Sequence, residues 1–267
     1  MLTDTPQTWH YGLVARWWAE FNADGAEIDY FRRFVEHGQP ALDVGCGTGR
    51  LLLPYLRDGL DVDGCDVSAD MVALCRERAE REGLAPTLFV TPMHELSPPR
   101  RYRTIYVCGA FGLGSTRPQD QEALRRFYEA LEPGGTFVLD NEAPYADPNE
   151  WRYWLTEERR ALPEARRPPG ERRLAADGSE LALRARIIAL DPLEQSVSYE
   201  MHAFQWRDGE LVAEERHGLT LSLYFRNELV LMLERAGFVD VDVRGGYDDG
   251  PPTPEHRFLV FVAKRQV

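Results

Sequence analysis

The sequence predicts an α/β fold in which a doubly wound sheet carries its ligand-binding loops at the carboxyl ends of the strands. Three observations support this prediction. Gly45, Gly47 and Gly49 stand at alternate positions just after the short apolar segment Ala41-Leu42, as expected of a tight turn from a buried strand into a helix. Further candidate strands follow the glycine run along the chain, up to residue 143. The chain of 267 residues is also long enough to carry structure beyond one such unit.

Composition and charge limit the possible partners. Hydrophobic residues make up 43% of the chain and charged residues 28%, which is ordinary for a soluble globular protein, and no apolar run is long enough to span a membrane. Residues Met1–Pro6 lack a signal-peptide pattern, so we expect a cytoplasmic location. The net charge of −13 disfavours nucleic acid as a partner, because phosphate backbones repel an acidic surface. The four cysteines form no C-x-x-C pair and the histidines no metal-spaced cluster, so we expect buried thiols and no metal site.

Two amphipathic helices are predicted ahead of the glycine run. Residues 9–22 carry apolar side chains at helical spacing, and residues 28–35 repeat the pattern. The simplest interpretation is that the two helices pack on the rest of the fold and bury most of their aromatic side chains.

The glycine run is built to hold a ligand against the main chain. The helix that starts at Leu51-Leu52-Leu53 points its first amides into the space beside the run. A dinucleotide fingerprint requires G-x-G-x-x-G, but Arg50 occupies the place of its third glycine. A Walker loop is excluded because no Gly-Lys-Ser/Thr follows.

A second signal follows about twenty residues downstream of the glycine run. Residues 60–66 read as the second strand, and Asp66 stands at its carboxyl end, where a carboxylate can accept two hydrogen bonds from a ribose diol. Ser68 is placed to cap the next helix. Together with the glycine run, this position indicates that Asp66 binds a nucleoside ligand rather than serving as a solvated turn residue.

Three more segments complete the series. Residues 86–90 are predicted as the third strand and residues 104–108 as the fourth, which leads into the small-residue stretch 109–114. The segment Leu131-Glu132-Pro133-Gly134-Gly135 then turns into the fifth strand.

These five ordered segments, from Ala41 to Glu142, resemble the class I S-adenosylmethionine-dependent methyltransferases. The resemblance implies methyltransferase activity, with S-adenosylmethionine as cofactor and S-adenosylhomocysteine as product. It also implies a Rossmann-like mixed sheet of seven strands in the order 3-2-1-4-5-7-6, and N-terminal helices that form a lid over the cofactor. The cofactor-binding residues that it implies are Asp43, Gly45, Cys46, Gly47, Gly49, Asp66, Val67, Met71, Met93, Cys108 and Gly109.

Two positions depart from the pattern of the family. Many relatives have an aspartate before the equivalent of Met93, where it binds the adenine amino group, but this chain has Pro92. The adenine contact must therefore come from elsewhere or be absent. Relatives that act on amino sugars often place a histidine shortly after the fourth strand, where this chain has Gly114, Ser115 and Thr116. An amino-sugar acceptor and a histidine base at that point are therefore in doubt.

The remaining chain adds an insertion and then returns to the core. Alternating residues at 180–190, 196–206 and 211–223 predict an antiparallel meander appended to the main sheet, which roofs the acceptor pocket or forms a homodimer contact. Trp151, Tyr153 and Trp154 are candidates to line that pocket, and the arginine-rich stretch 159–173 is interpreted as a solvated, mobile loop. A helix at 225–236, stopped by Gly237, precedes a final hairpin at 238–244 and 257–264. The expected parts are a lid (1–37), a methyltransferase core (38–143 and 225–267) and the insertion (144–224).

The function expected from this resemblance is methyl transfer to N or O of a small-molecule acceptor. Such an enzyme mainly has to align donor and acceptor and to remove a proton from the acceptor. Candidate bases are Glu142, His94 and Tyr11, with His10 ranked after them, and the carboxylate of Glu142 has Arg226 or another cation as an alternative partner. Two alternatives stay open: a cofactor-binding protein without methyl-transfer activity, in an assembly or regulatory role, and an NAD-dependent oxidoreductase.

Overall fold

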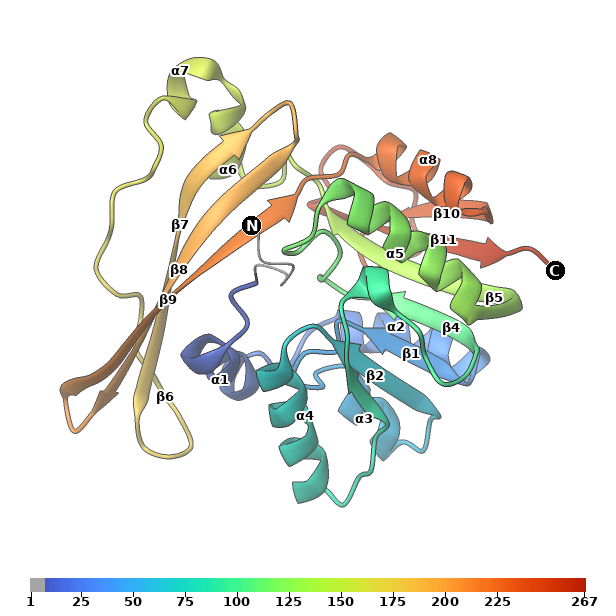
Figure 1. Cartoon of the computed structure of the whole chain (residues 1–267), viewed down its shortest axis with the longest axis horizontal. Coiled ribbons are helices and arrows are strands. Elements are labelled where there is room, and N and C mark those ends of the chain that lie inside the picture. The colour runs from blue at the N-terminus through green and yellow to red at the C-terminus, as the bar shows by residue number, and fades with distance from the viewer. Residues whose placement is uncertain (1–7) are drawn as a thin grey trace.

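The computed structural model describes residues 8–267, which form two β-sheets with helices around them (Figure 1). The larger sheet has seven strands in the order β10-β11-β5-β4-β1-β2-β3. β11 is antiparallel to both of its neighbours, and the other pairs are parallel. With β10 and β11 counted as strands six and seven, the predicted order 3-2-1-4-5-7-6 is confirmed. The strands are β1 (Ala41–Val44), β2 (Val62–Asp66), β3 (Leu88–Val90), β4 (Tyr102–Val107), β5 (Leu131–Glu142), β10 (Phe238–Gly245) and β11 (Phe258–Arg265).

Helices cover both faces of this sheet. Successive side chains of a strand point to opposite faces, so apolar side chains lie on both and pack against helices. On β4, Ile105 and Val107 join the apolar cluster beneath α5 and α8, whereas Tyr106 joins the cluster beneath α2, α3 and α4. The helices are α2 (Glu27–His37), α3 (Leu52–Arg57), α4 (Ala69–Arg81), α5 (Arg117–Ala130) and α8 (Arg226–Ala236). Ser68 caps α4 as predicted, and its hydroxyl accepts a hydrogen bond from Met71 N at 3.2 Å. Gly237 ends α8 with φ of 104°, also as predicted.

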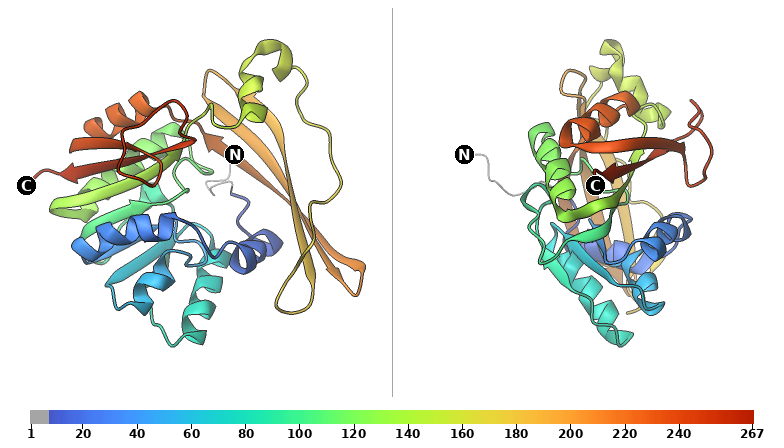
Figure 2. Two further views of the ribbon diagram at one scale, coloured as in Figure 1. Left: turned by 180° about the vertical axis from the view of Figure 1, so that it is seen from behind. Right: turned by 90° about the vertical axis from the view of Figure 1, so that its right-hand side faces the viewer.

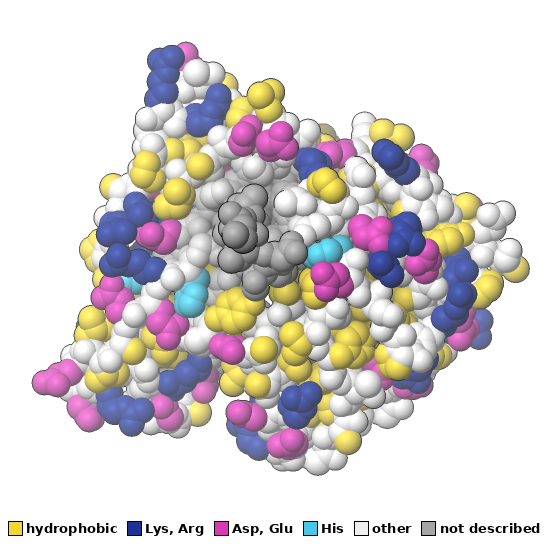
Figure 3. All heavy atoms as spheres, viewed as in Figure 1, with side chains coloured by type: hydrophobic (Ala, Val, Ile, Leu, Met, Phe, Trp, Pro, Cys, Tyr) yellow, Lys and Arg dark blue, Asp and Glu magenta, His cyan; other side chains and the backbone are white. Residues whose placement is uncertain are grey.

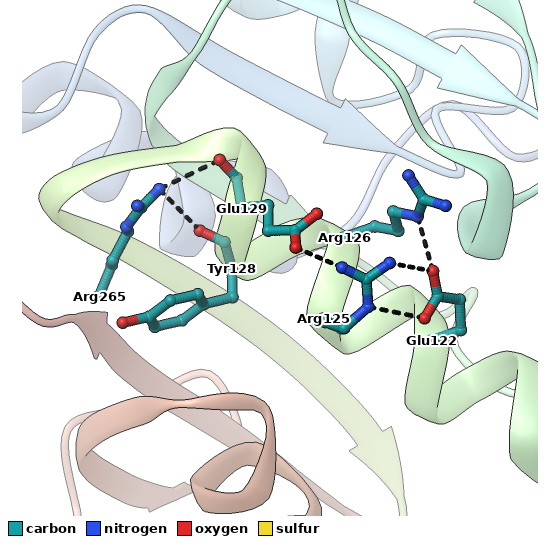
Figure 4. Close-up of polar contacts among 6 residues, drawn as sticks. All are labelled: Glu122, Arg125, Arg126, Tyr128, Glu129 and Arg265. Atoms are coloured by element: carbon teal, nitrogen blue, oxygen red, sulfur yellow. Dashed lines mark hydrogen bonds and ion pairs between the residues drawn. The ribbon is translucent and has the colours of Figure 1, made fainter.

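The carboxyl end of α5 is fixed by a side chain from the last strand. Arg265 of β11 donates hydrogen bonds to the carbonyls of Tyr128 and Glu129, at 3.1 and 3.0 Å (Figure 4). A guanidinium group at this end of a helix satisfies carbonyls that have no partner within the helix. On the exposed side of α5, Arg125 pairs with Glu122 and Glu129, and ion pairs so exposed contribute little to stability.

The predicted meander forms a second, separate antiparallel sheet. Its strands are β6 (Arg173–Leu174), β7 (Glu180–Asp191), β8 (Ser196–Arg207) and β9 (Glu210–Ser222), and they pair in chain order. The loop that follows β4 contacts β9 of the second sheet, where Gly114 N donates to Thr220 O at 2.8 Å and Ser222 N donates to Gly112 O at 3.0 Å. The predicted antiparallel meander is therefore confirmed, as a separate sheet appended to the larger one. Three short helices precede β6: α6 (Pro148–Trp151), η2 (Arg152–Trp154) and α7 (Thr156–Arg159).

The two N-terminal helices attach to different parts of the fold. α1 (Gly12–Phe21) lies between the second sheet and α4, and its Leu13 and Val14 pack against Leu181 and Met201 of that sheet (Figure 2). α2 packs instead on the larger sheet. Residues 1–7 of the predicted lid, including the segment considered for a signal peptide, lie outside the described residues. Within residues 8–267, no helix has the length and apolar character needed to cross a membrane.

Candidate functional site

A cavity of about 610 Å³ opens at the carboxyl ends of β1, β2, β4 and β5, beside α1. Ligands of open α/β sheets bind at this edge. One predicted residue, Gly49, does not line the cavity. It faces α3 and α4 instead, where a Cβ at this position would stand 2.7 Å from atoms of Leu53 and Cys75. Gly49 thus allows close packing of α3 and α4 rather than close approach of a ligand. The other predicted cofactor residues do line it: Asp43, Gly45, Cys46, Gly47, Asp66, Val67, Met71, Met93, Cys108 and Gly109.

The glycine run takes the conformation that only glycine adopts easily. Gly45, Gly47 and Gly49 have φ of 79°, 54° and 84°. The amides of Gly45 and Cys46 both donate to Cys65 O, at 2.8 and 2.9 Å, which holds the run against the end of β2. A Cβ at Gly47 would meet nothing within 4 Å, so this residue faces open space in the cavity. The run therefore leaves room for a ligand at Gly47.

Asp66 faces the cavity and also holds the backbone that lines it. One carboxylate oxygen accepts from Gly47 N at 2.9 Å and the other from Ser68 N at 2.8 Å. Burial raises the pKa of this carboxyl, and the backbone hydrogen bonds oppose the rise. Each oxygen keeps a further lone pair, so the group can still accept hydrogen bonds from a diol. Asp66 is the last residue of β2 and partly buried, rather than a turn residue.

Asp43 brings a second carboxyl to the cavity, and it is more deeply buried. Only 3% of the residue is exposed, and burial raises its pKa to about 8. The nearby charge of Asp66 adds to this rise. A buried carboxyl without a cation is costly to ionise, so the position suits a ligand that brings positive charge.

Asp140, at the end of β5, was not among the predicted site residues. Its carboxylate accepts hydrogen bonds from Gly109 N and from the Tyr247 hydroxyl, both at 2.5 Å. It therefore fixes the end of β4, where Gly109 lines the cavity. Arg50, which stands in place of a third glycine, also lines the cavity and pairs with Glu27 of α2.

Two of the predicted bases line the cavity and the third does not. His94 lines it and lies 3.3 Å from the side-chain amide of Gln119. Glu142 is at the rim, with 64% of its side chain exposed, and its partner is Arg257 at 3.5 Å rather than Arg226.

Tyr11 is not a lining residue and stands at the N-cap of α1. Burial raises its pKa, and the charges of Asp66 and Asp70 raise it further, which disfavours the phenolate. Of the three candidate bases, Tyr11 is therefore the one that the fold does not bring to the cavity lining.

His10 does line the cavity, although the sequence ranked it last. Its Nδ1 lies 2.6 Å from Thr8 Oγ1, and Trp9 Nε1 donates to its Nε2 at 3.1 Å. Burial lowers its pKa to about 4, so the ring is neutral at pH 7.

The cavity is also lined by a buried acid that the sequence did not reveal. Asp120 of α5 is 1% exposed, and it accepts hydrogen bonds from Ser115 Oγ at 2.5 Å and from the Tyr224 hydroxyl at 2.6 Å. Burial raises its pKa. Trp9 and Trp18 also line the cavity. The aromatic residues predicted for this role are elsewhere: Trp151, Tyr153 and Trp154 lie with Phe225 and the far end of the second sheet.

Comparisons with known proteins agree with this geometry. A family model described as a methyltransferase domain matches residues 41–135. A protein of Geobacillus sp. (strain WCH70) that is named as a methyltransferase is 22% identical over 262 residues, which cover 93% of this chain and 97% of that protein. The dTDP-3-amino-3,4,6-trideoxy-alpha-D-glucopyranose N,N-dimethyltransferase of Streptomyces venezuelae is 28% identical over 123 residues, which cover 45% of this chain and 50% of that protein.

Among solved structures, the CcbJ methyltransferase from Streptomyces caelestis aligns with a TM-score of 0.69 at 20% identity, over 96% of this chain and 100% of that one. Because the alignment covers 96% of this chain, the shared fold includes both sheets. The family match favours a methyltransferase over an NAD-dependent oxidoreductase and over a protein that only binds the cofactor. Residues 41–135 and the strand order around them identify a class I S-adenosylmethionine-dependent methyltransferase domain in this chain, with S-adenosylmethionine as methyl donor and S-adenosylhomocysteine as product.

Proposed function

We propose that this enzyme transfers the methyl group to an amine nitrogen of a small metabolite. The observation that carries the proposal is the make-up of the cavity lining, which includes the carboxyl groups of Asp120 and Glu142 and the indole rings of Trp9 and Trp18. Among the described lining residues, Arg50 is the one Lys or Arg, and a carboxylate already pairs with it. Carboxylates and aromatic faces both attract an ammonium group, whereas they repel a carboxylate or phenolate acceptor.

A relative supports nitrogen as the accepting atom. The matched Streptomyces venezuelae enzyme is named for N,N-dimethylation of an amino sugar, and the match covers half of that protein. The present chain has Gly114, Ser115 and Thr116 where amino-sugar enzymes often have a histidine. The proposal therefore concerns the amine group of the acceptor and leaves the amino sugar aside.

An ammonium group must lose its proton before nitrogen can attack the methyl carbon. His10 is a poor proton acceptor, because both of its ring nitrogens are engaged and its pKa is low. Glu142 is exposed at the rim of the cavity, where it can pass a proton to bulk water. We assign this task to Glu142 and the binding of the cation to Asp120.

The cofactor-binding residues follow from the lining of the cavity. We assign the ribose hydroxyls to Asp66, and the methionine part to the run at Gly45–Gly49 with Asp43 facing its ammonium group. Beside Pro92, the polar side chains of Thr91 and His94 line the cavity and are available to the adenine amino group. When bound, the cofactor supplies an electrophilic methyl group, and the protein has to align it with the acceptor.

The experiment is a methyl-transfer screen with labelled S-adenosylmethionine. Acceptors are tested in matched sets of similar size and shape that carry an amine, a hydroxyl or a carboxylate. We expect product from amines only, and we expect Asp120→Asn to raise the KM for the amine while cofactor affinity stays within twofold. Methyl transfer to hydroxyl acceptors in preference to their amine counterparts would refute the proposal.

We also propose that the second sheet forms a homodimer contact. Leu174 on β6 and Leu211 and Val212 on β9 are at least half exposed on the two edge strands of the second sheet, where the surface of a second copy would cover them. Light scattering on the wild type and on Leu211→Asp should show a dimer and a monomer, respectively. A monomeric wild type would refute this proposal.

A further inference from the structure

A second cavity, of about 340 Å³, lies along the edge of β7. Its walls come from three parts of the chain: the segment of α6 and η2, residues 164–167, and strands β7 and β8. It shares no lining residue with the first cavity. The methyl-transfer reaction proposed above gives it no role.

The arginine-rich stretch beside this cavity is a loop, as predicted, and hydrogen bonds attach it to β7 at Glu164 and Pro168. Glu164 N donates to Ile187 O at 2.9 Å, and Ile187 N donates to Glu164 Oε2 at 3.0 Å. Arg186 donates to Glu164 O at 2.8 Å, and Arg184 donates to Pro168 O at 3.1 Å. The walls of the cavity are therefore organised before any ligand arrives, which lowers the entropic cost of binding.

The cavity gathers positive charge on a protein whose net charge is −13. Figure 3 shows Lys and Arg side chains, with acidic ones among them, on the left of the molecule over this sheet. Five arginines line the cavity against three carboxylates: Arg152, Arg166, Arg167, Arg184 and Arg186 against Asp147, Glu164 and Glu200.

The carboxylates do not neutralise these arginines. Arg186 and Arg166 share the single carboxylate of Glu200, at 2.9 and 3.6 Å, and together they lower its pKa. Arg184 donates to backbone carbonyls alone, and within residues 8–267 neither Arg184 nor Arg167 forms an ion pair. At least two guanidinium groups therefore retain donors for another anion.

We propose that the second cavity is a binding site for a phosphorylated small molecule, whose phosphate is held by Arg167 and Arg184. Guanidinium groups bind phosphate through paired N–H donors, and the volume is within the range of small-ligand sites. Tyr199 lines this cavity, and its ring centroid lies 5.7 Å from that of Trp9, which lines the first cavity. These two rings separate the sites, so the ligand binds independently of the cofactor.

The test is a calorimetric titration of the full chain with inorganic pyrophosphate at low salt. We expect saturable binding of one pyrophosphate per chain, and we expect Arg167→Gln/Arg184→Gln to weaken it at least tenfold. Arg226→Gln is the matched control: among residues 8–267 this exposed arginine of α8 donates only to Asn227, so the substitution should leave binding unchanged. A saturating amount of S-adenosylhomocysteine should also leave it unchanged.

Three results would overturn the proposal. The first is the absence of pyrophosphate binding, and the second is an equal loss in the Arg226→Gln control. The third is displacement of pyrophosphate by S-adenosylhomocysteine, which would place the anion in the first cavity. Should the double variant fail to fold, Arg167→Glu replaces it, because Arg167 is exposed and forms no ion pair within residues 8–267, and the same tenfold loss is expected.

Discussion

At the scale of single residues, Asp66 has two tasks, because its carboxylate fixes the glycine run and faces the cavity. Asp66→Ala removes the charge-assisted hydrogen bond to the glycine run and those proposed to the ribose hydroxyls. We therefore expect it to weaken the binding of S-adenosylhomocysteine by about 1 to 3 kcal/mol. Calorimetry measures the affinity, and circular dichroism checks that the fold persists. Asp61→Ala, at an exposed carboxylate just before β2, is the matched control. An affinity unchanged in Asp66→Ala would remove the ribose assignment.

Asp43 gives the ligand-free protein a pH dependence. Burial raises its folded-state pKa from 3.8 to about 8, so between these values the folded protein keeps a proton that the unfolded chain has lost. The free energy of unfolding therefore falls as the pH rises from 3.8 to about 8, by up to about 1.4 kcal/mol for each pH unit. Burial raises the pKa of Asp66, Asp120 and Asp140 as well, with the same sign. In urea unfolding at pH 5.5 and pH 8, we expect Asp43→Asn to lose less stability than the wild type. An equal loss in the two proteins would show that Asp43 ionises freely.

At the scale of elements, α1 depends on side chains from distant parts of the chain. Its N-cap Tyr11 gives no side-chain hydrogen bond, and instead Glu215 of β9 accepts from Leu13 N and Asp70 of α4 accepts from Gly12 N, both at 2.8 Å. Loss of a cap costs about 0.5 to 2 kcal/mol, so we expect Glu215→Ala to lower the free energy of unfolding by that amount. It should also weaken cofactor binding, because the segment before α1 lines the cavity. Glu214→Ala, on the opposite face of β9, is the control, and equal effects in both variants would contradict this account.

The elements also show how much the sequence could predict. The strands of the larger sheet, the glycine run and strands β7, β8 and β9 follow from local apolar and glycine patterns, and their predicted bounds are close to the observed ones, whereas β6 was not predicted. Asp120 and Asp140 gave no such signal, because their burial depends on Tyr224 and Tyr247, which follow them by 104 and 107 residues. Tyr11 was misplaced for a similar reason, since Asp70 and Glu215 fix where α1 begins. Local pattern predicts elements, whereas the polar contacts between them require the fold.

At the scale of the whole molecule, the net charge of −13 and the carboxylates of the first cavity should favour cationic ligands. S-adenosylmethionine carries the sulfonium charge that S-adenosylhomocysteine lacks, and the two are otherwise alike in shape. Salt screens such attraction, with a Debye length of about 10 Å at 0.1 M and about 3 Å at 1 M. We therefore expect the Kd of S-adenosylmethionine to rise more steeply than that of S-adenosylhomocysteine when sodium chloride is increased in a calorimetric titration. S-adenosylhomocysteine serves as the internal control for general salt effects on the protein. Parallel salt dependences for both ligands would mean that short-range contacts alone hold the sulfonium, and the charge argument for an amine acceptor would lose its support.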